Sequence, residues 1–223
     1  MDLKLLINAL TKFIIGLLCI GLLLFIPAGS IYYTNGWLFI GLLFVPMFIV
    51  GVVLFIKNPE LLRKRLNAKE KESEQKEVVL FSGLMFLSGF IIAGLNYRFN
   101  WINISNIVVI IASILFLLSY VLYAEVLREN AYLSRTIEVQ ENQKVIDTGL
   151  YGIVRHPMYA TTVILFLTIP LILGSIISFI IFLIYPIIIS KRINNEEEVL
   201  EKELVGYKEY KQKVKYKLIP FIW

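Results

Sequence analysis

Two polar stretches in the second half of the chain hold the residues that could do chemistry. The first, residues 147–159, contains two glycines around an aromatic side chain, then Arg155 and the chain's only histidine, His156, just before Pro157. Proline suits the first turn of a helix and pushes the residue before it into an extended conformation. We therefore expect Arg155 and His156 in a turn beside free backbone N–H groups, which suits a carboxylate or a phosphate. The competing interpretation is a helix entrance whose arginine is anchored at the lipid headgroups.

The second stretch, residues 191–200, places three consecutive glutamates where an apolar run ends. Adjacent residues of a helix diverge by about 100°, so Glu196 and Glu197 cannot point at one ligand atom in the same way. One carboxylate could face a cationic ligand group while the other fixes a neighbouring arginine or helix end. Arg192 lies four residues before Glu196, close enough to pair with it. A solvated charged helix would explain Glu198 but not the boundary position of the two glutamates before it.

The elements that must position these residues are strongly apolar. Of the 223 residues, 58% are hydrophobic, and the mean hydropathy is +0.75, above what a soluble domain can bury. The apolar residues form blocks long enough to cross about 30 Å of hydrocarbon. We therefore predict an all-α, polytopic integral membrane helix bundle, folded as a single domain over residues 1–223. One cysteine, Cys19, excludes an intrachain disulfide.

Four spans and a C-terminal transmembrane hairpin account for the apolar blocks. The expected bounds are 13–33, 37–56, 78–95 and 104–127 for the spans, and 157–173 and 176–192 for the hairpin. Residues 160–189 carry no charge, and one helix of that length would measure about 45 Å, well beyond the bilayer core. Gly174-Ser175 near the middle favours two helices, the second continuing to about Leu204. A cleaved signal peptide is the other interpretation of the first block, because Ala28-Gly29-Ser30 supplies small residues.

The polar segment 57–77 opens with Asn58-Pro59-Glu60, a typical start of a helix. We expect the leucines that follow, Leu61, Leu62 and Leu66, to lay one face of this short helix on the membrane surface.

Charge placement predicts the orientation. Lysine and arginine accumulate on the cytoplasmic side of membrane proteins. With the N-terminus inside and the hairpin folded, all 22 basic residues except Arg98 fall on that side. A single span in place of the hairpin would move the eight basic residues from Lys191 onward outside. We therefore expect both termini in the cytoplasm.

All substantial polar sequence then lies on one face, which is the geometry of an enzyme that meets a soluble reagent at the membrane surface. A transporter would place ionisable groups near the middle of the membrane, and these spans contain almost none. One histidine and one cysteine make no metal site. Nucleic acid is not indicated either, because topology accounts for the basic residues.

Taken together, the two stretches resemble the isoprenylcysteine carboxyl methyltransferase family, within the group of membrane methyltransferases that includes phospholipid methyltransferases. The family signature is a Thr-Gly-x-Tyr turn leading into Arg-His-Pro-x-Tyr, then Arg-Ile-x-x-Glu-Glu-x-x-Leu after a hydrophobic hairpin, then tyrosines and Pro-Phe. The matching residues here are 148–151, 155–159, 192–200, Tyr207, Tyr210, Pro220 and Phe221. The chain departs from the pattern at Leu150, where the family often has proline, and at Thr161, where it usually has glycine. Eukaryotic members have more spans, so the resemblance is to prokaryotic members and implies the cytoplasmic membrane of a prokaryote.

The resemblance implies S-adenosyl-L-methionine as the cofactor and a cofactor-binding part over residues 128–223. The implied cofactor-binding residues are Gly149, Tyr151, His156, Tyr159, Glu196 and Glu197. Arg155 or Arg192 would steer an anionic acceptor. A carboxylate acceptor is already ionised at pH 7, so no general base is needed and catalysis reduces to positioning and desolvation.

Three functions stay open at this point. The first is carboxyl O-methylation of an isoprenylcysteine-like or other lipophilic acceptor. The second is N-methylation of a phospholipid amine with the same cofactor. The third is a non-catalytic membrane scaffold or a transporter. The expected partners are a lipid-like or prenylated small substrate and membrane lipids.

Overall fold

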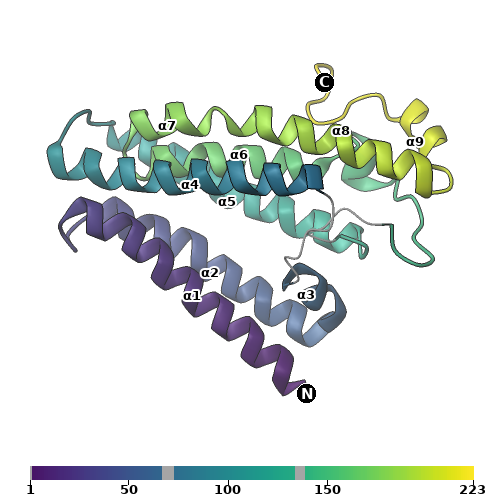
Figure 1. Cartoon of the computed structure of the whole chain (residues 1–223), viewed down its shortest axis with the longest axis horizontal. Coiled ribbons are helices and arrows are strands. Elements are labelled where there is room, and N and C mark those ends of the chain that lie inside the picture. The colour runs from purple at the N-terminus through teal and green to yellow at the C-terminus, as the bar shows by residue number, and fades with distance from the viewer. Residues whose placement is uncertain (1, 67–72, 134–138) are drawn as a thin grey trace.

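Long apolar helices make up most of the protein, because leucine, isoleucine, valine and phenylalanine fill the sequence between short polar segments. The computed structural model describes residues 2–66, 73–133 and 139–223. Within these residues every regular element is a helix, and five helical segments are long and apolar enough to cross a bilayer. The predicted polytopic all-α membrane bundle is therefore confirmed. Figure 1 shows the long helices of the C-terminal part lying along the long axis, with the first two helices running obliquely to them.

The described residues form four long helices and then a series of shorter ones. The bounds are α1 (Leu3–Ala28), α2 (Thr34–Lys57), α3 (Pro59–Leu66), α4 (Ser73–Phe99), α5 (Asn106–Glu129), the 3₁₀ turn η1 (Gly149–Gly152), α6 (Pro157–Ile172), α7 (Ile176–Phe182), α8 (Tyr185–Glu203) and α9 (Tyr207–Lys213).

Helix α1 differs from the expected first span, 13–33, at both ends. The carboxylate of Asp2 accepts a hydrogen bond from the backbone N–H of Leu5 at 3.2 Å, so the helix begins ten residues earlier. It ends at Gly29, whose left-handed φ of +64° suits glycine. The reason for the difference is that hydropathy marks the lipid-facing part of a helix, while capping residues set where the helix begins and ends.

Helix α4 approaches its neighbours closely on two sides, because glycine replaces a side chain at each contact. A Cβ at Gly94 would lie 2.6 Å from the carbonyl oxygen of Leu24 in α1. A Cβ at Gly89 would lie 2.3 Å from the ring of Phe182 in α7, and the hydroxyl of Ser178 donates to the Gly89 carbonyl at 2.8 Å. Small residues allow such close helix packing in membranes, and α4 thereby joins the N-terminal helices to the C-terminal hairpin.

The C-terminal hairpin turns where the sequence predicts, at Gly174-Ser175. Gly174 has a φ of +77° and Ser175 caps α7. The turn exposes backbone carbonyls, which are costly to leave unpaired in an apolar medium. The hydroxyl of Tyr33 donates to the carbonyl of Leu173, and the side-chain amide of Asn96 donates to the carbonyl of Gly174 at 3.3 Å. The second arm consists of α7 and α8 and extends to Glu203, beyond its apolar part, as predicted.

Helix α3 begins where the sequence predicts, with Asn58 Oδ1 accepting from the N–H of Leu61 at 3.1 Å. Its apolar face does not lie on the membrane surface as expected. Leu61 and Leu62 are only 2% and 6% exposed, because α3 folds back against α1 and α2. Leu61 and Leu62 are thus buried by protein rather than by lipid headgroups, while Leu66, the third leucine of the expected face, is half-buried.

Both termini, α3 and α9 lie towards the same end of the bundle, which we call the polar end (Figure 1). This arrangement agrees with the one-sided placement of polar sequence expected from charge. The assignment of the polar end to the cytoplasm stays a prediction.

Candidate active site

The site begins in the turn that enters α6. The N–H groups of Arg155 and His156 donate to the carbonyls of Tyr216 and Lys217, each at 2.9 Å. The expectation that free N–H groups here would hold an anion is therefore wrong for these two residues. Both N–H groups are paired with the C-terminal segment, so any ligand at this turn would be bound by side chains rather than by these two N–H groups.

Beneath this turn, the buried carboxylate of Glu197 lies close to several nitrogen-bearing side chains. Oε1 of Glu197 lies 2.7 Å from Nε of Arg155 and 3.2 Å from Nε2 of His156, and its other oxygen lies 3.3 Å from Nζ of Lys217. Glu197 is 3% exposed and Arg155 is 6% exposed. Arg155 also donates to the carbonyls of Val214 and of the residue after it, at 2.7 and 2.8 Å. This cluster ties the α6 entrance, α8 and the C-terminal segment into one unit.

A second polar cluster lies beside the first, on the ring of Tyr159. The Tyr159 hydroxyl donates to Oε2 of Glu196 and accepts a hydrogen bond from Nε of Arg192 at 2.9 Å. The rings of Tyr159 and His156 stack, with centroids 5.7 Å apart. The imidazole and the phenol thereby hold each other in place between the two clusters.

The turn η1 supports the floor of the site and depends on a glycine. Gly149 has a φ of +53°, and a Cβ there would lie 1.5 Å from Oε1 of Glu129. That carboxylate accepts from the N–H of Leu150 at 3.0 Å. The hydroxyl of Tyr151 accepts from the side-chain amide of Asn130 at 3.0 Å. The backbone of η1 is therefore fixed to the end of α5.

Helix α9 closes the site from the other side. The hydroxyl of Tyr210 donates to the carbonyl of Tyr151 at 2.7 Å. Burial raises the pKa of both tyrosines above its ordinary value, so both stay protonated phenols in the folded protein. Tyr210 packs with Tyr207, Leu204 and Val214 in a small apolar cluster apart from the main core. We call these four residues the tail cluster.

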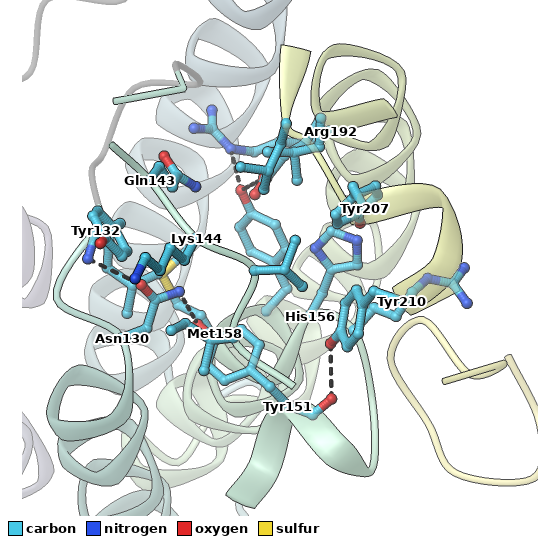
Figure 2. Close-up of a pocket in the computed structure, with 18 residues that line it drawn as sticks. Asn130, Tyr132, Gln143, Lys144, Tyr151, His156, Met158, Arg192, Tyr207 and Tyr210 are labelled. Atoms are coloured by element: carbon cyan, nitrogen blue, oxygen red, sulfur yellow. Dashed lines mark hydrogen bonds between the residues drawn. The ribbon is translucent and has the colours of Figure 1, made fainter. Parts of the chain in front are cut away.

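These elements surround a cleft at the polar end, with about 830 Å³ of space when its open mouth is included. Figure 2 shows Asn130, Tyr132, Gln143 and Lys144 on one side and His156, Tyr207 and Tyr210 on the other. The full lining is Asn130, Tyr132, Leu133, residues 143–146, Tyr151, Arg155, His156, Met158, Tyr159, Arg192, Glu196, Leu200, Leu204, Tyr207 and Tyr210.

The structure brings all eight sequence-predicted site residues to this end of the bundle. Six of them line the cleft: Tyr151, Arg155, His156, Tyr159, Arg192 and Glu196. Gly149 and Glu197 lie behind the lining, Gly149 against Glu129 and Glu197 against Arg155 and His156. The individual roles given to the eight residues stay predictions.

Sequence reasoning missed the residues that close the cleft. Asn130, Gln143 and Lys144 come from the segment after α5, whose only signal was its polar composition. Tyr207 and Tyr210 belonged to the family-like tail but were not named as site residues.

Helix α3 also reaches the cleft. Nζ of Lys64 donates to the side chain of Gln140 at 2.5 Å, and Arg65 contacts the hydroxyl of Tyr123 and the sulfur of Met158. No sequence pattern indicates these contacts, because the partners lie 58 to 93 residues apart in the chain.

Comparison with known proteins addresses the same part of the chain. Residues 107–202 match the model of the Isoprenylcysteine carboxyl methyltransferase (ICMT) family, which confirms the resemblance seen in the sequence. The matched segment runs from α5 through the hairpin to the end of α8 and contains the second polar cluster and, of the first, Arg155, His156 and Glu197. A search of curated proteins gives no match to the chain.

Proposed function

We propose that the protein transfers a methyl group from S-adenosylmethionine to the head of a lipophilic acceptor, because residues 107–202 match the model of the isoprenylcysteine carboxyl methyltransferase family. The coarser statement, a methyltransferase of the membrane, follows from the family and the apolar helices. The observation that supports the finer one is the cleft, where Tyr159, Glu196 and Arg192 converge as α6 and α8 meet the polar end.

The lining of the cleft fits the chemistry of this cofactor. One wall is apolar and aromatic, with Leu200 and Leu204 beside two tyrosines, and suits an adenine ring. The carboxylate of Glu196 suits a hydroxyl or an ammonium group. Lys144 supplies positive charge for the carboxylate of the cofactor. When bound, the cofactor would supply a methyl group already activated on a sulfonium.

The chain's own residues then have three tasks: to bind, to orient and to exclude water. Arg192 lines the cleft and donates to Tyr159 through Nε, which fixes the direction of its guanidinium. We propose that Arg192 steers an anionic acceptor head. Arg155 is held by Glu197 and two backbone carbonyls, so its contribution is to keep the α6 entrance in position. A carboxylate head needs no proton removed at pH 7, and positioning is enough.

The position of the cleft supports an amphiphilic acceptor. Its lining includes Met158 and Tyr159 from the first turn of α6, whose following residues are apolar. An acceptor with its tail in lipid and its head at the polar end would reach the cleft without leaving the bilayer. We propose an isoprenylcysteine-like carboxylate as the first such compound. Glu196 in the lining favours phosphatidylethanolamine as the second candidate, because a carboxylate can take the proton that an amine must lose.

The test is methyl transfer by the protein in lipid nanodiscs. Tritiated S-adenosylmethionine is supplied with farnesyl-cysteine in one arm and phosphatidylethanolamine in the other. We expect labelled farnesyl-cysteine ester, and a loss of at least tenfold in kcat/KM with Arg192→Ala. Arg128→Ala is the matched control, because Arg128 is 71% exposed, pairs with Glu125 and is outside the lining. Label in the phospholipid alone would replace O-methylation by N-methylation, and label in neither would refute the proposed acceptors.

A further inference from the structure

Tyr207 carries a hydroxyl that the described part of the protein leaves without a hydrogen-bond partner. Its side chain lines the cleft and is only 4% exposed, and no described residue pairs with its Oη. One other buried polar atom in the described residues is in the same condition, Nδ2 of Asn195, but Asn195 is not part of the lining. A buried hydroxyl without a partner is unfavourable, and in native proteins it calls for a specific explanation.

The hydroxyl cannot turn away to reach water, because its ring is fixed. Tyr207 belongs to the tail cluster and packs on Tyr210, with ring centroids 5.7 Å apart. Gly206, with a φ of +87°, starts α9 directly before it, and Val145 packs against the cluster. The packing therefore keeps the hydroxyl buried and unpaired on a residue that lines the cleft, at a cost to the protein without ligand.

The charges around this hydroxyl select the group that it meets. Burial raises the pKa of Tyr207, the carboxylates of Glu197 and Glu196 raise it further, and the guanidinium of Arg155 lowers it. Tyr207 therefore stays a neutral phenol near the carboxylate of Glu196, which lines the same cleft. A ligand group with donor hydrogens can bond both to that carboxylate and to the phenol oxygen.

We propose that the Tyr207 hydroxyl is a cofactor-recognition group, which hydrogen-bonds a ribose hydroxyl or the ammonium group of the nucleoside cofactor beside Glu196. The inference rests on the proposed function and names a residue outside the segment that matches the family. Ribose hydroxyls and ammonium share the required chemistry, since both bring donor hydrogens to the carboxylate side of the cleft. The protein without cofactor thus keeps an unpaired hydroxyl, and binding supplies its partner.

The experiment compares two variants that each remove one phenolic oxygen from α9. Affinity for S-adenosylhomocysteine is measured by calorimetry in nanodiscs, and the melting temperature is measured without ligand. Tyr207→Phe is expected to weaken binding about tenfold, the equivalent of one hydrogen bond of about 1.4 kcal/mol. It should leave the melting temperature without ligand unchanged or raised, because it removes an unpaired buried group. Tyr210→Phe, the control, should lower that temperature, because it breaks the bond to the Tyr151 carbonyl.

Ligand analogues identify the group that is recognised. The 2′-deoxy, 3′-deoxy and deaminated forms of S-adenosylhomocysteine each remove one candidate. We expect the analogue that lacks the partner group to bind wild type and Tyr207→Phe equally, while the other two still show the tenfold difference. Equal affinity of wild type and Tyr207→Phe for S-adenosylhomocysteine would overturn the inference and leave the proposed function standing. No binding to wild type would overturn both.

Discussion

Removing the carboxylate of Glu197 tests whether this residue builds the site rather than touching ligand. Glu197 is 3% exposed, and its Oε1 lies 2.7 Å from Nε of Arg155. At an effective dielectric constant of about 20, unit charges at that separation attract by about 6 kcal/mol, and desolvation offsets part of this. Breaking one side of a buried pair typically costs about 3–5 kcal/mol, because the other charge is left without compensation.

We therefore expect Glu197→Ala to lower the free energy of unfolding by about 3–5 kcal/mol, a large share of the 5–15 kcal/mol typical of a folded domain. Glu198→Ala is the control, because Glu198 is exposed on the next position of the same helix, and its effect should stay within about 0.5 kcal/mol. The measurement is reversible unfolding in mixed micelles. In Glu197→Ala combined with Arg155→Ala, the loss should be smaller than the sum of the single losses, because the two residues interact directly.

A small effect of Glu197→Ala on stability would refute this reasoning. A loss below about 1 kcal/mol in Glu197→Ala, matching Glu198→Ala, would refute the buried pair as a structural element. If binding of S-adenosylhomocysteine were then lost without any change in stability, Glu197 would contact the cofactor directly, as the resemblance implied.

Three further outcomes are expected. Stability should fall as the pH rises above about 10, because tyrosines ionise near that pH in the unfolded chain. In the folded chain, burial raises the pKa of Tyr151, Tyr207 and Tyr210. Unfolding midpoints that stay constant from pH 8 to about 11 would contradict this prediction. S-adenosylhomocysteine at a thousandfold excess over its Kd should stabilise the protein by about 4 kcal/mol in a thermal-shift assay, and the absence of a shift in both detergent and nanodiscs would favour a scaffold. Cysteines introduced at Glu60 and Lys215, in a Cys19→Ser background, should both be labelled from the cytoplasmic side, and labelling of position 215 from outside would exclude the hairpin.

The general architecture could be predicted because hydropathy and breaks are properties of the chain itself. The uncharged run 160–189 is too long for one span, and Gly174-Ser175 divides it where the structure turns. Helix ends were less accessible. Asp2 caps α1 through its side chain, and such a contact outranks the point at which hydropathy begins to rise.

Which of the site side chains point into the cleft could be predicted only in part. The 100° between neighbours on a helix separates Glu196 from Glu197, and the structure does place one in the cleft lining and the other behind it. The arginine that Glu197 fixes, Arg155, lies 42 residues away and on another helix entrance, so helix spacing could not identify it. Tyr207 was missed for a different reason. Its hydroxyl stands out because it has no hydrogen-bond partner among the described residues, and no sequence pattern indicates this.

The two hydrogen bonds that hold the hairpin turn bear on how the protein inserts into the membrane. Tyr33, between α1 and α2, and Asn96, near the end of α4, hold the carbonyls of Leu173 and Gly174. Synthesis runs from the N-terminus, so both donors are already threaded into the bilayer when the hairpin arrives. The hairpin is therefore synthesised after the residues that bind its turn. The N-terminal half of the chain supplies the hydrogen-bond donors, and the C-terminal half supplies the acceptors. In a chain that begins after α2, Tyr33 would be absent and the Leu173 carbonyl would lose its donor. We expect such a chain to insert its hairpin less efficiently.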